Sequence, residues 1–321
     1  MIEVKNVTKK YGNNVVVDNI NFTINDGEIV GFLGRNGAGK STTMNMITGF
    51  IEPTSGEIIV EGYNIDKNPK KVKKQIGYMP EGVPLYLDLT VKEFVNYMAE
   101  LKKVPGKERE EAVRKALEKT GLLDVQNKLN KNLSRGYKQR VSMAGALVGN
   151  PKILILDEPT VGLDPKQVTE IRNLIKSLRK DHTVILSSHI LSEVSQICEK
   201  VIIIDKGKIL AVNTPENLEQ EATDKTEIIL VVEDELGKFE KIKEIIPKIE
   251  KLELLNSEDK TKTYKITSNP QEDIRKDLFN ECSKENIAII EMKKEEVSLE
   301  DAFIKIIDNI KKDEEQEGGE K

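Results

Sequence analysis

The sequence contains no tryptophan, only two cysteines and two histidines, and few aromatic residues of any kind, at 4%. Cys198 and Cys282 are too few and too far apart for a disulfide framework or a cysteine-rich metal site. No apolar run approaches the about 20 residues that a membrane-spanning helix needs. The opening residues MIEVKNVTKKYG lack the apolar stretch of a signal peptide and favour a strand. We therefore expect a cytoplasmic protein whose membrane role, if it has one, comes through a partner.

What the sequence does contain is a large share of charge, 33%, beside 38% hydrophobic residues in a chain of 321. This composition and length predict a globular protein with two domains. The net charge of −5 is uneven, because residues 225–321 carry −8 and residues 1–224 carry +3. A basic front half suits a polyphosphate ligand, and an acidic back half argues against a nucleic-acid partner.

The alternation of strands and helices indicates an α/β fold in the first two thirds of the chain. Short apolar runs at 153–156, 183–186 and 201–204 are typical of buried parallel strands. Between about 84 and 145 the apolar residues recur with a helical period instead. We predict an α/β domain over residues 1–222, with a β-rich subdomain and a helical insertion.

The last third has a different pattern, with the order βαββαβ, which is that of the ferredoxin-like split unit. It predicts a small α+β accessory domain over 225–311, including a helix at 238–249. Residues 312–321 are charged and lack apolar side chains, so we expect a disordered acidic tail there.

A glycine-rich segment at 34–41, GRNGAGKS, matches the phosphate-binding pattern G-x-x-x-x-G-K-[ST]. Its glycines let backbone N–H groups point at phosphate oxygens, and the following helix presents its positive end to the same anion. Lys40 supplies a charge for the β- and γ-phosphates, and Ser41 a hydroxyl for Mg²⁺. A strand before and a helix after the segment argue against a chance match. The predicted nucleotide-binding residues here are Gly34, Asn36, Gly37, Ala38, Gly39, Lys40, Ser41 and Thr42.

Two acids, Asp157 and Glu158, end the apolar strand at 153–156. Taken alone, they are equally compatible with a solvated turn that Pro159 closes. With a phosphate-binding loop upstream, Asp157 fits a ligand of Mg²⁺, and Glu158 fits the base that polarises the attacking water.

With these motifs the sequence resembles the ABC ATPase family over about residues 1–220. Residues 133–137, LSRGY, stand where that family has its LSGGQ signature, with departures at Arg135 and Tyr137. The resemblance implies that Ser134 and Gly136 bind the γ-phosphate of an ATP held by the opposite subunit. In isolation, the motif is also compatible with a serine-capped helix that binds no ligand.

Three further residues take roles from the same resemblance. Asp164 matches the D-loop acid that acts across the dimer, although a local role as a helix cap is compatible with it. His189 matches the switch histidine that contacts the γ-phosphate and completes a catalytic set with Glu158 and Lys40. Tyr11 matches the aromatic residue that stacks on adenine, or is a hairpin tyrosine. His182 has no such match, and we expect it on the surface.

Glu81 occupies the position where the family has the glutamine of its Q-loop, and its carboxylate is a candidate ligand of Mg²⁺. The Tyr-x-Pro-Glu form, the altered signature and the C-terminal appendage together resemble ATPases of ABC-2 type exporters, such as the daunorubicin-resistance and gliding-motility groups.

The resemblance implies an ATPase that uses ATP and Mg²⁺ and closes as a homodimer, or as a pseudo-symmetric dimer with a paralogous ATPase. It also implies an integral membrane permease as partner, and a peripheral position on the inner face of the cell membrane. An apolar cluster of Val83, Leu85, Tyr86 and Leu87 either docks that permease or packs inside the helical insertion.

Three other functions are less compatible with the sequence. A soluble ABC ATPase of translation or DNA repair usually has two cassettes, a long coiled coil or zinc fingers, and none of these is present here. A small-molecule kinase or GTPase would share only the phosphate-binding loop. A regulatory module without turnover would require that the departures at Glu81 and Arg135 abolish hydrolysis.

Overall fold

The computed structural model describes residues 1–82, 85–221, 225–234, 237–258, 260–269, 273–295 and 298–318, with side chains as far as residue 308 except that of residue 221. The chain divides into two compact units, Met1–Pro215 and Glu216–Lys321. The division precedes the predicted boundary at 222, because the sheet of the first unit is complete before Pro215 begins a helix. Residues 222–224 lie outside the described ranges. None of the described helices is long and apolar enough to cross a membrane.

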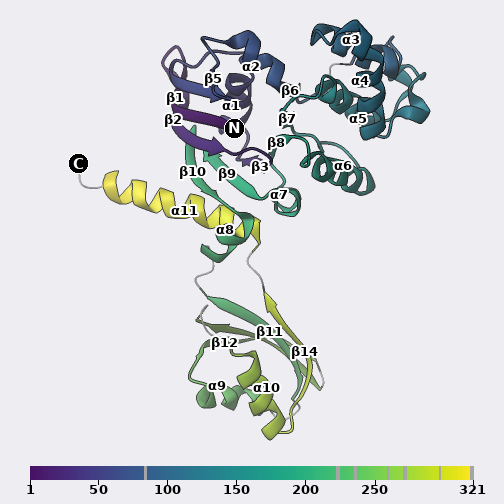
Figure 1. Ribbon diagram of the computed structural model, residues 1–321. Helices are drawn as coiled ribbons and strands as arrows, with labels where there is room; N and C mark the ends of the chain where they lie inside the picture. Colours follow the sequence, from purple (N-terminus) through teal and green to yellow (C-terminus); the bar gives the residue numbers. More distant parts are fainter. Residues whose placement is uncertain are drawn as a thin grey trace. The chain divides into compact units, whose positions relative to one another are not determined.

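The first unit begins with a four-stranded antiparallel sheet in the order β2-β1-β4-β5 (Figure 1). Its strands are β1 (Ile2–Tyr11), β2 (Asn14–Ile24), β4 (Ser55–Val60) and β5 (Tyr63–Asn64). Buried and exposed residues alternate at 20–24 in β2, as expected for a sheet with one face on the core, whereas register shifts interrupt the alternation in β1.

The second sheet of this unit has six strands in the order β10-β9-β3-β8-β7-β6, and all neighbours are parallel except β10 and β9. The strands are β3 (Ile29–Leu33), β6 (Ile76–Met79), β7 (Ile153–Asp157), β8 (Thr183–Ser188), β9 (Lys200–Asp205) and β10 (Lys208–Asn213). Every residue of β3, β7 and β8 is buried, which explains the apolar runs at 29–33, 153–156 and 184–186.

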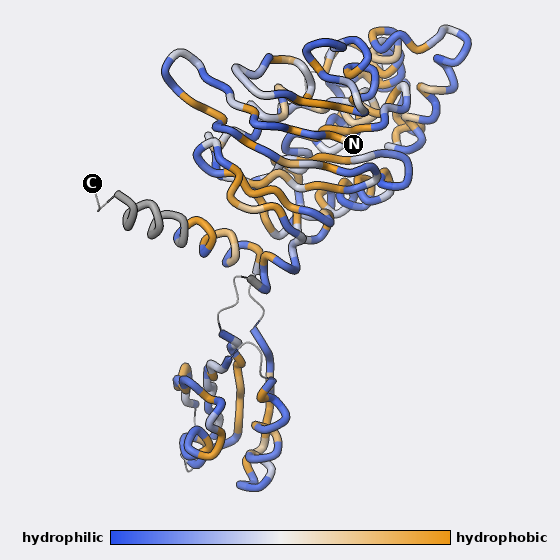
Figure 2. Tube along the Cα trace, turned by 60° about the vertical axis from the view of Figure 1, so that its left-hand side comes forward, coloured by the Kyte–Doolittle hydropathy of each residue, from blue (hydrophilic) through white to orange (hydrophobic). Residues whose placement is uncertain are grey.

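The two sheets share one hydrophobic core, in which the rings of Phe22 and Phe32 lie 5.7 Å apart between centroids. The apolar strands of this unit are visible as orange segments in Figure 2. Four helices accompany the sheets: α1 (Lys40–Ile47), α2 (Pro69–Gln75), α6 (Pro165–Leu178) and α7 (Leu191–Ile197).

The helical insertion is a separate cluster of three helices, which Figure 1 shows gathered at one side of the unit. They are α3 (Val91–Leu101), α4 (Gly106–Lys119) and α5 (Arg135–Leu147). The cluster has its own hydrophobic core, and Thr90 and Glu93 begin α3 with a reciprocal capping box. This arrangement confirms the α/β fold with an inserted helical part.

The second unit contains a four-stranded antiparallel sheet in the order β12-β13-β11-β14. Its elements are α8 (Pro215–Glu221), β11 (Thr226–Glu233), α9 (Ile242–Ile245), β12 (Ile249–Glu258), β13 (Thr261–Ser268), α10 (Arg275–Lys284), β14 (Ala288–Glu295) and α11 (Leu299–Gly318). This order along the chain and across the sheet is ferredoxin-like, as predicted. The rings of Phe239 and Tyr264 pack together in its core, with their centroids 4.7 Å apart and their planes tilted by 35°.

Two predictions for this unit were wrong in extent. The helix expected at 238–249 is reduced to a 3₁₀ turn and the short helix α9, because Pro247 interrupts helical hydrogen bonding and Ile246 before it is extended. The tail expected to be disordered from 312 is instead helical through Gly318, in a segment whose lysine, glutamate and glutamine residues favour helix. Residues 319–321 are not described.

Candidate functional site

The phosphate-binding loop connects the end of β3 to the start of α1. Gly37 and Gly39 have φ values of 81° and 108°, in the left-handed region that glycine adopts without strain. A β-carbon at Gly39 would also lie 3.0 Å from the carbonyl oxygen of Val16. The glycines of the motif are therefore required by the backbone path of the loop, as the sequence predicted.

Lys40 is held inside this loop. Only 7% of the residue is exposed, and its Nζ donates to the carbonyl oxygens of Gly34 at 2.7 Å and Arg35 at 3.3 Å. The ammonium group therefore lies among loop carbonyls at the positive end of α1, where a bound phosphate would be attracted by both charges.

A second group of polar residues ends the neighbouring strands β7 and β8. Asp157 is 3% exposed and accepts a hydrogen bond from the hydroxyl of Ser187, its direct neighbour across the two strands. The same hydroxyl accepts a hydrogen bond of 3.0 Å from the backbone N–H of Glu158. Sequence reasoning did not assign Ser187, and its one signal was a serine pair at the end of an otherwise apolar strand.

Glu158 is buried and has an unusual backbone conformation. Its φ of 48° is in the left-handed region, which is strained for a residue other than glycine, asparagine or aspartate and which often marks functional sites. Nδ1 of His189, beyond the end of β8, lies 2.9 Å from a carboxylate oxygen of Glu158. The imidazole fixes the orientation of the carboxylate, so the predicted base and the predicted switch residue form one pair.

A cavity of about 450 Å³ brings these groups together. Glu81, Glu158 and His189 line it together with residues of the phosphate-binding loop. Its described lining is Val16, Arg35, Asn36, Gly37, Gly39, Lys40, Ser41, Thr42, Glu81, Glu158, Val161 and His189. Val16 and Val161 were missed by sequence reasoning, because an apolar residue in a strand or turn carries no signal of its own.

Two carboxylates, Glu81 and Glu158, line this cavity. Burial, followed by the charges of Asp157 and Glu81, raises the pKa of Tyr78 to about 12. Two carboxylates near one phenol form a hard-oxygen environment that suits Mg²⁺, a cation usually held by one or two carboxylates and the substrate phosphates. The described residues contain no group of three His, Cys, Asp or Glu that could hold a metal ion.

Other predicted site residues lie away from the cavity lining. Tyr11 ends β1 with 52% exposure, and Nζ of Lys9 lies 5.1 Å from the centre of its ring. Asp164 caps α6, accepting a hydrogen bond of 2.9 Å from the N–H of Gln167, so its local role is present. His182 is not on the surface as expected: it is 2% exposed, with Nδ1 2.6 Å from the Pro151 carbonyl oxygen, and burial lowers its pKa.

The signature residues stand at the start of α5. Ser134 is exposed, and its side chain makes no capping hydrogen bond to the helix. The reading of this motif as a serine-capped helix is therefore wrong. Neither Ser134 nor Gly136 lines the cavity, so the same chain has an unfilled helix start outside its own phosphate-binding site.

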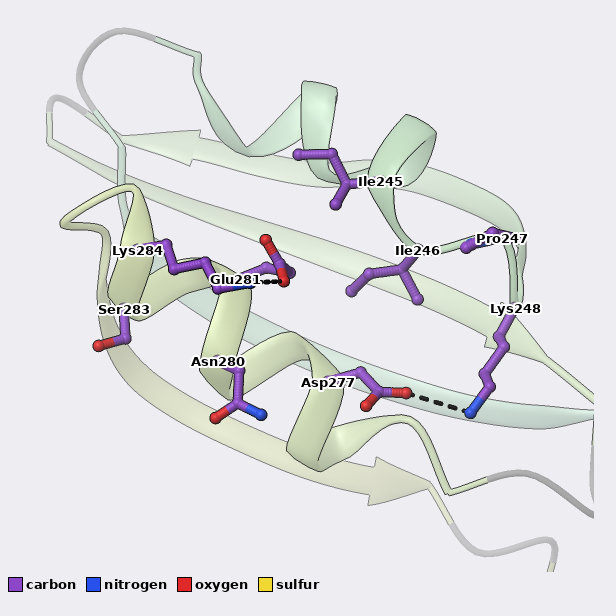
Figure 3. Close-up of a pocket in the computed structure, with 9 residues that line it drawn as sticks. All are labelled: Ile245, Ile246, Pro247, Lys248, Asp277, Asn280, Glu281, Ser283 and Lys284. Atoms are coloured by element: carbon purple, nitrogen blue, oxygen red, sulfur yellow. Dashed lines mark hydrogen bonds and ion pairs between the residues drawn. The ribbon is translucent and has the colours of Figure 1, made fainter.

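The second unit has a groove of about 480 Å³ between α9 and α10, shown in Figure 3. An ion pair of 3.2 Å between Lys248 and Asp277 lies across one end, and Ile245 and Ile246 cover another side. None of the predicted site residues lines this groove, and it has no counterpart of the phosphate-binding loop.

Comparison with known proteins agrees with the geometry. The model of the ABC transporter family matches residues 17–161. The chain is 44% identical to the bacitracin transport ATP-binding protein BcrA of Bacillus licheniformis, over 65% of this chain and 68% of that protein. It is 37% identical to the linearmycin resistance ATP-binding protein LnrL of Bacillus subtilis (strain 168), over 68% and 70%.

A solved structure shows the same fold. The dimeric ATP-binding cassette MJ0796, bound to ADP and Pi in a post-hydrolysis state, superposes with a TM-score of 0.60 at 30% identity, over 67% of this chain and 98% of that one. The chain belongs to the family of ABC transporter ATP-binding proteins. It is an ATP-binding ATPase that works with a membrane transporter, and its relatives confirm the resemblance to the ABC-2 type exporter group.

Proposed function

We propose that this chain is the ATPase subunit of an ABC-2 type exporter, and that it hydrolyses ATP between its own phosphate-binding loop and the signature helix of a second subunit. The observation that carries the proposal is the separation of these two parts: the cavity collects the loop, Glu158 and His189, whereas Ser134 lies outside it. A site divided in this way requires two chains.

The roles follow from the positions of the side chains. Lys40 and the backbone N–H groups at the start of α1 bind the phosphates. Glu158 polarises the attacking water, and His189 orients its carboxylate and contacts the γ-phosphate. Ser41, Asp157 and Glu81 supply oxygen ligands for Mg²⁺, which neutralises phosphate charge when it is bound. Tyr11 stacks on the adenine with a ring that is 52% exposed.

The second subunit completes the charge compensation. Ser134 and Gly136 of one chain approach the γ-phosphate held by the other, and Asp164 acts across the same contact. A half-site with donors from one chain leaves that charge poorly compensated, so a monomer hydrolyses ATP slowly. Both a homodimer and a pair with a paralogous ATPase provide this arrangement.

A surface on the helical insertion fits the permease. Tyr86 and Leu87 are 54% and 50% exposed, and the ring of Tyr97 meets that of Tyr86 edge-on at 5.3 Å. Leu85 of the predicted cluster packs against the core of the insertion instead, and Val83 lies outside the described residues. A short apolar permease helix covering these side chains would hold the chain on the inner face of the membrane.

Export is the direction of transport that the relatives favour, since two of them are named for bacitracin transport and linearmycin resistance. The second unit serves as an accessory domain after the ATPase domain. Its acidic sequence, at −8 over residues 225–321, is unfavourable for a nucleic-acid partner.

The test is co-purification from the source cell. The tagged full-length chain is isolated from membranes in mild detergent and compared with a Tyr86→Asp, Leu87→Asp variant of unchanged melting temperature. We expect a stoichiometric multi-span protein with the native chain and its loss with the variant. Recovery of the native chain only from the soluble fraction, or on ribosomes or DNA, would overturn the exporter proposal and leave the ATPase intact.

A further inference from the structure

The first turns of α5 pack directly on the segment that follows β7. Nε2 of Gln139, a buried side chain, donates a hydrogen bond of 2.8 Å to the carbonyl oxygen of Pro159. One turn earlier on the helix, a β-carbon at Gly136 would lie 2.8 Å from Cδ of Gln167. The beginning of the signature helix and residues 159–167 of the same chain are therefore in close contact.

Arg135 adds a third contact between these segments. A β-carbon at Gly162 would overlap the guanidinium of Arg135, so the guanidinium occupies the space where any other residue at 162 would place its side chain. Gly162 has a φ of 69° as well.

The same arginine shares a cavity with the proposed base. A space of about 180 Å³ lies between α5 and the two carboxylates. Its lining includes Arg135, Lys138 and Gln139 of α5, together with Val161, Glu81 and Glu158. Glu81, Glu158 and Val161 also line the nucleotide cavity, so the two spaces share a wall. The contact of Arg135 with Gly162 lies four residues beyond Glu158. Two overlapping turns connect them, because the N–H of Val161 donates to the carbonyl oxygen of Glu158 at 3.3 Å and that of Leu163 to the carbonyl oxygen of Thr160 at 3.2 Å.

We propose that Arg135 is a positioning residue that acts within its own chain. Its planar guanidinium, lying against Gly162, holds the turn after β7 and with it the carboxylate of Glu158. The signature helix that meets the partner's nucleotide is in this way connected to the base of its own site. This inference rests on the proposed role of Glu158.

The alternative is that Arg135 acts in the opposite subunit, as a charge close to the partner's γ-phosphate. A point charge would serve that role, and Lys would replace Arg there. Packing against a glycine backbone depends on the flat guanidinium, which Lys lacks. The two roles also affect different sites of a dimer. Positioning Glu158 affects hydrolysis in the site of the same chain, whereas a charge at the partner's γ-phosphate affects hydrolysis in the site of the other chain.

The first experiment uses four single variants of the full-length chain: Arg135→Gln, Arg135→Lys, Gly162→Asn and, as a control, Lys131→Gln, whose lysine pairs on the surface with Asp88. Asn tolerates the left-handed backbone, so Gly162→Asn displaces the guanidinium with little backbone strain. We expect kcat to fall about tenfold in the first three, with KM for ATP within about twofold of native and melting temperatures unchanged. The double variant Arg135→Gln, Gly162→Asn should be no slower than either single variant.

The second experiment uses mixed dimers that carry two different tags, in which one subunit has Glu158→Gln and therefore a dead base. We expect Arg135→Gln to reduce the remaining hydrolysis only when it is placed in the subunit with intact Glu158. A loss confined to Arg135→Gln in the Glu158→Gln subunit, or full rescue by Arg135→Lys, would overturn the inference. Undiminished hydrolysis by the Glu158→Gln homodimer would instead show that the proposed role of Glu158 fails.

Discussion

The helices α1 and α5 each begin at a predicted ATP-binding motif, but in different surroundings. The start of α1 is enclosed: Lys40 is 7% exposed and bonded to two loop carbonyls, and a cavity collects the base and the histidine around it. The start of α5 is open: Ser134 is exposed and caps nothing. Both present a positive helix end to an anion. The difference supports our proposal that one chain has a site for its own nucleotide and a surface for another chain's nucleotide.

Removing the base should have the largest effect on ATP turnover. The substitution leaves both helix starts intact. We expect Glu158→Gln to lower ATP turnover at least about 100-fold, since an amide cannot accept the proton of the attacking water. The bound ATP should then hold two chains together, giving an ATP-dependent dimer on size-exclusion chromatography. The control is Glu199→Gln, which removes a surface partner of Arg179. A Glu158→Gln chain that stays monomeric in ATP would contradict the two-chain site.

The enclosed start is tested by Lys40→Ala. Its ammonium is the charge inside the loop, so phosphate release should fall about 100-fold and the affinity for a fluorescent ATP analogue should weaken. Lys74→Ala, on the exposed face of α2, serves as the matched control. Unchanged turnover in Lys40→Ala would remove the basis for the nucleotide site at α1.

A substitution at the open start of α5 should lower ATP turnover without weakening the binding of the analogue to the monomer. Ser134→Arg fills the exposed helix start with a bulky cation while leaving the cavity of the same chain unaltered. We expect turnover to fall about tenfold or more, because the donors that complete the second chain's site are blocked. Binding of the fluorescent analogue to the monomer should stay within about twofold of native. A parallel loss of binding would mean that α5 contributes to the nucleotide site of its own chain.

The sequence was most informative where a chemical requirement is local. The glycines at 37 and 39 have the left-handed backbone that the loop pattern predicted, and Asp157 and Glu158 stand at the end of β7, where the apolar run placed them. Their roles in binding and catalysis stay predictions. Features that depend on tertiary contacts were not predictable. The hydrogen bond from the hydroxyl of Ser187 to Asp157 joins residues that are 30 apart in the chain. The buried imidazole of His182 is hydrogen-bonded to the carbonyl oxygen of Pro151, 31 residues earlier. The left-handed conformation of Glu158 also carries no sequence signal.

The start of α6 offers the smallest and most local comparison, because it has the side-chain cap that α5 lacks. Asp164 accepts a hydrogen bond from the N–H of Gln167. Asp164→Ala should therefore destabilise the first unit by about 1 kcal/mol, whereas Asp164→Asn should retain most of the stability. Urea unfolding of the two variants measures this difference. Because Asn preserves the cap but removes the charge, a loss of turnover in Asp164→Asn at native stability would isolate the role of Asp164 between subunits. Native turnover in that variant would restrict Asp164 to capping α6.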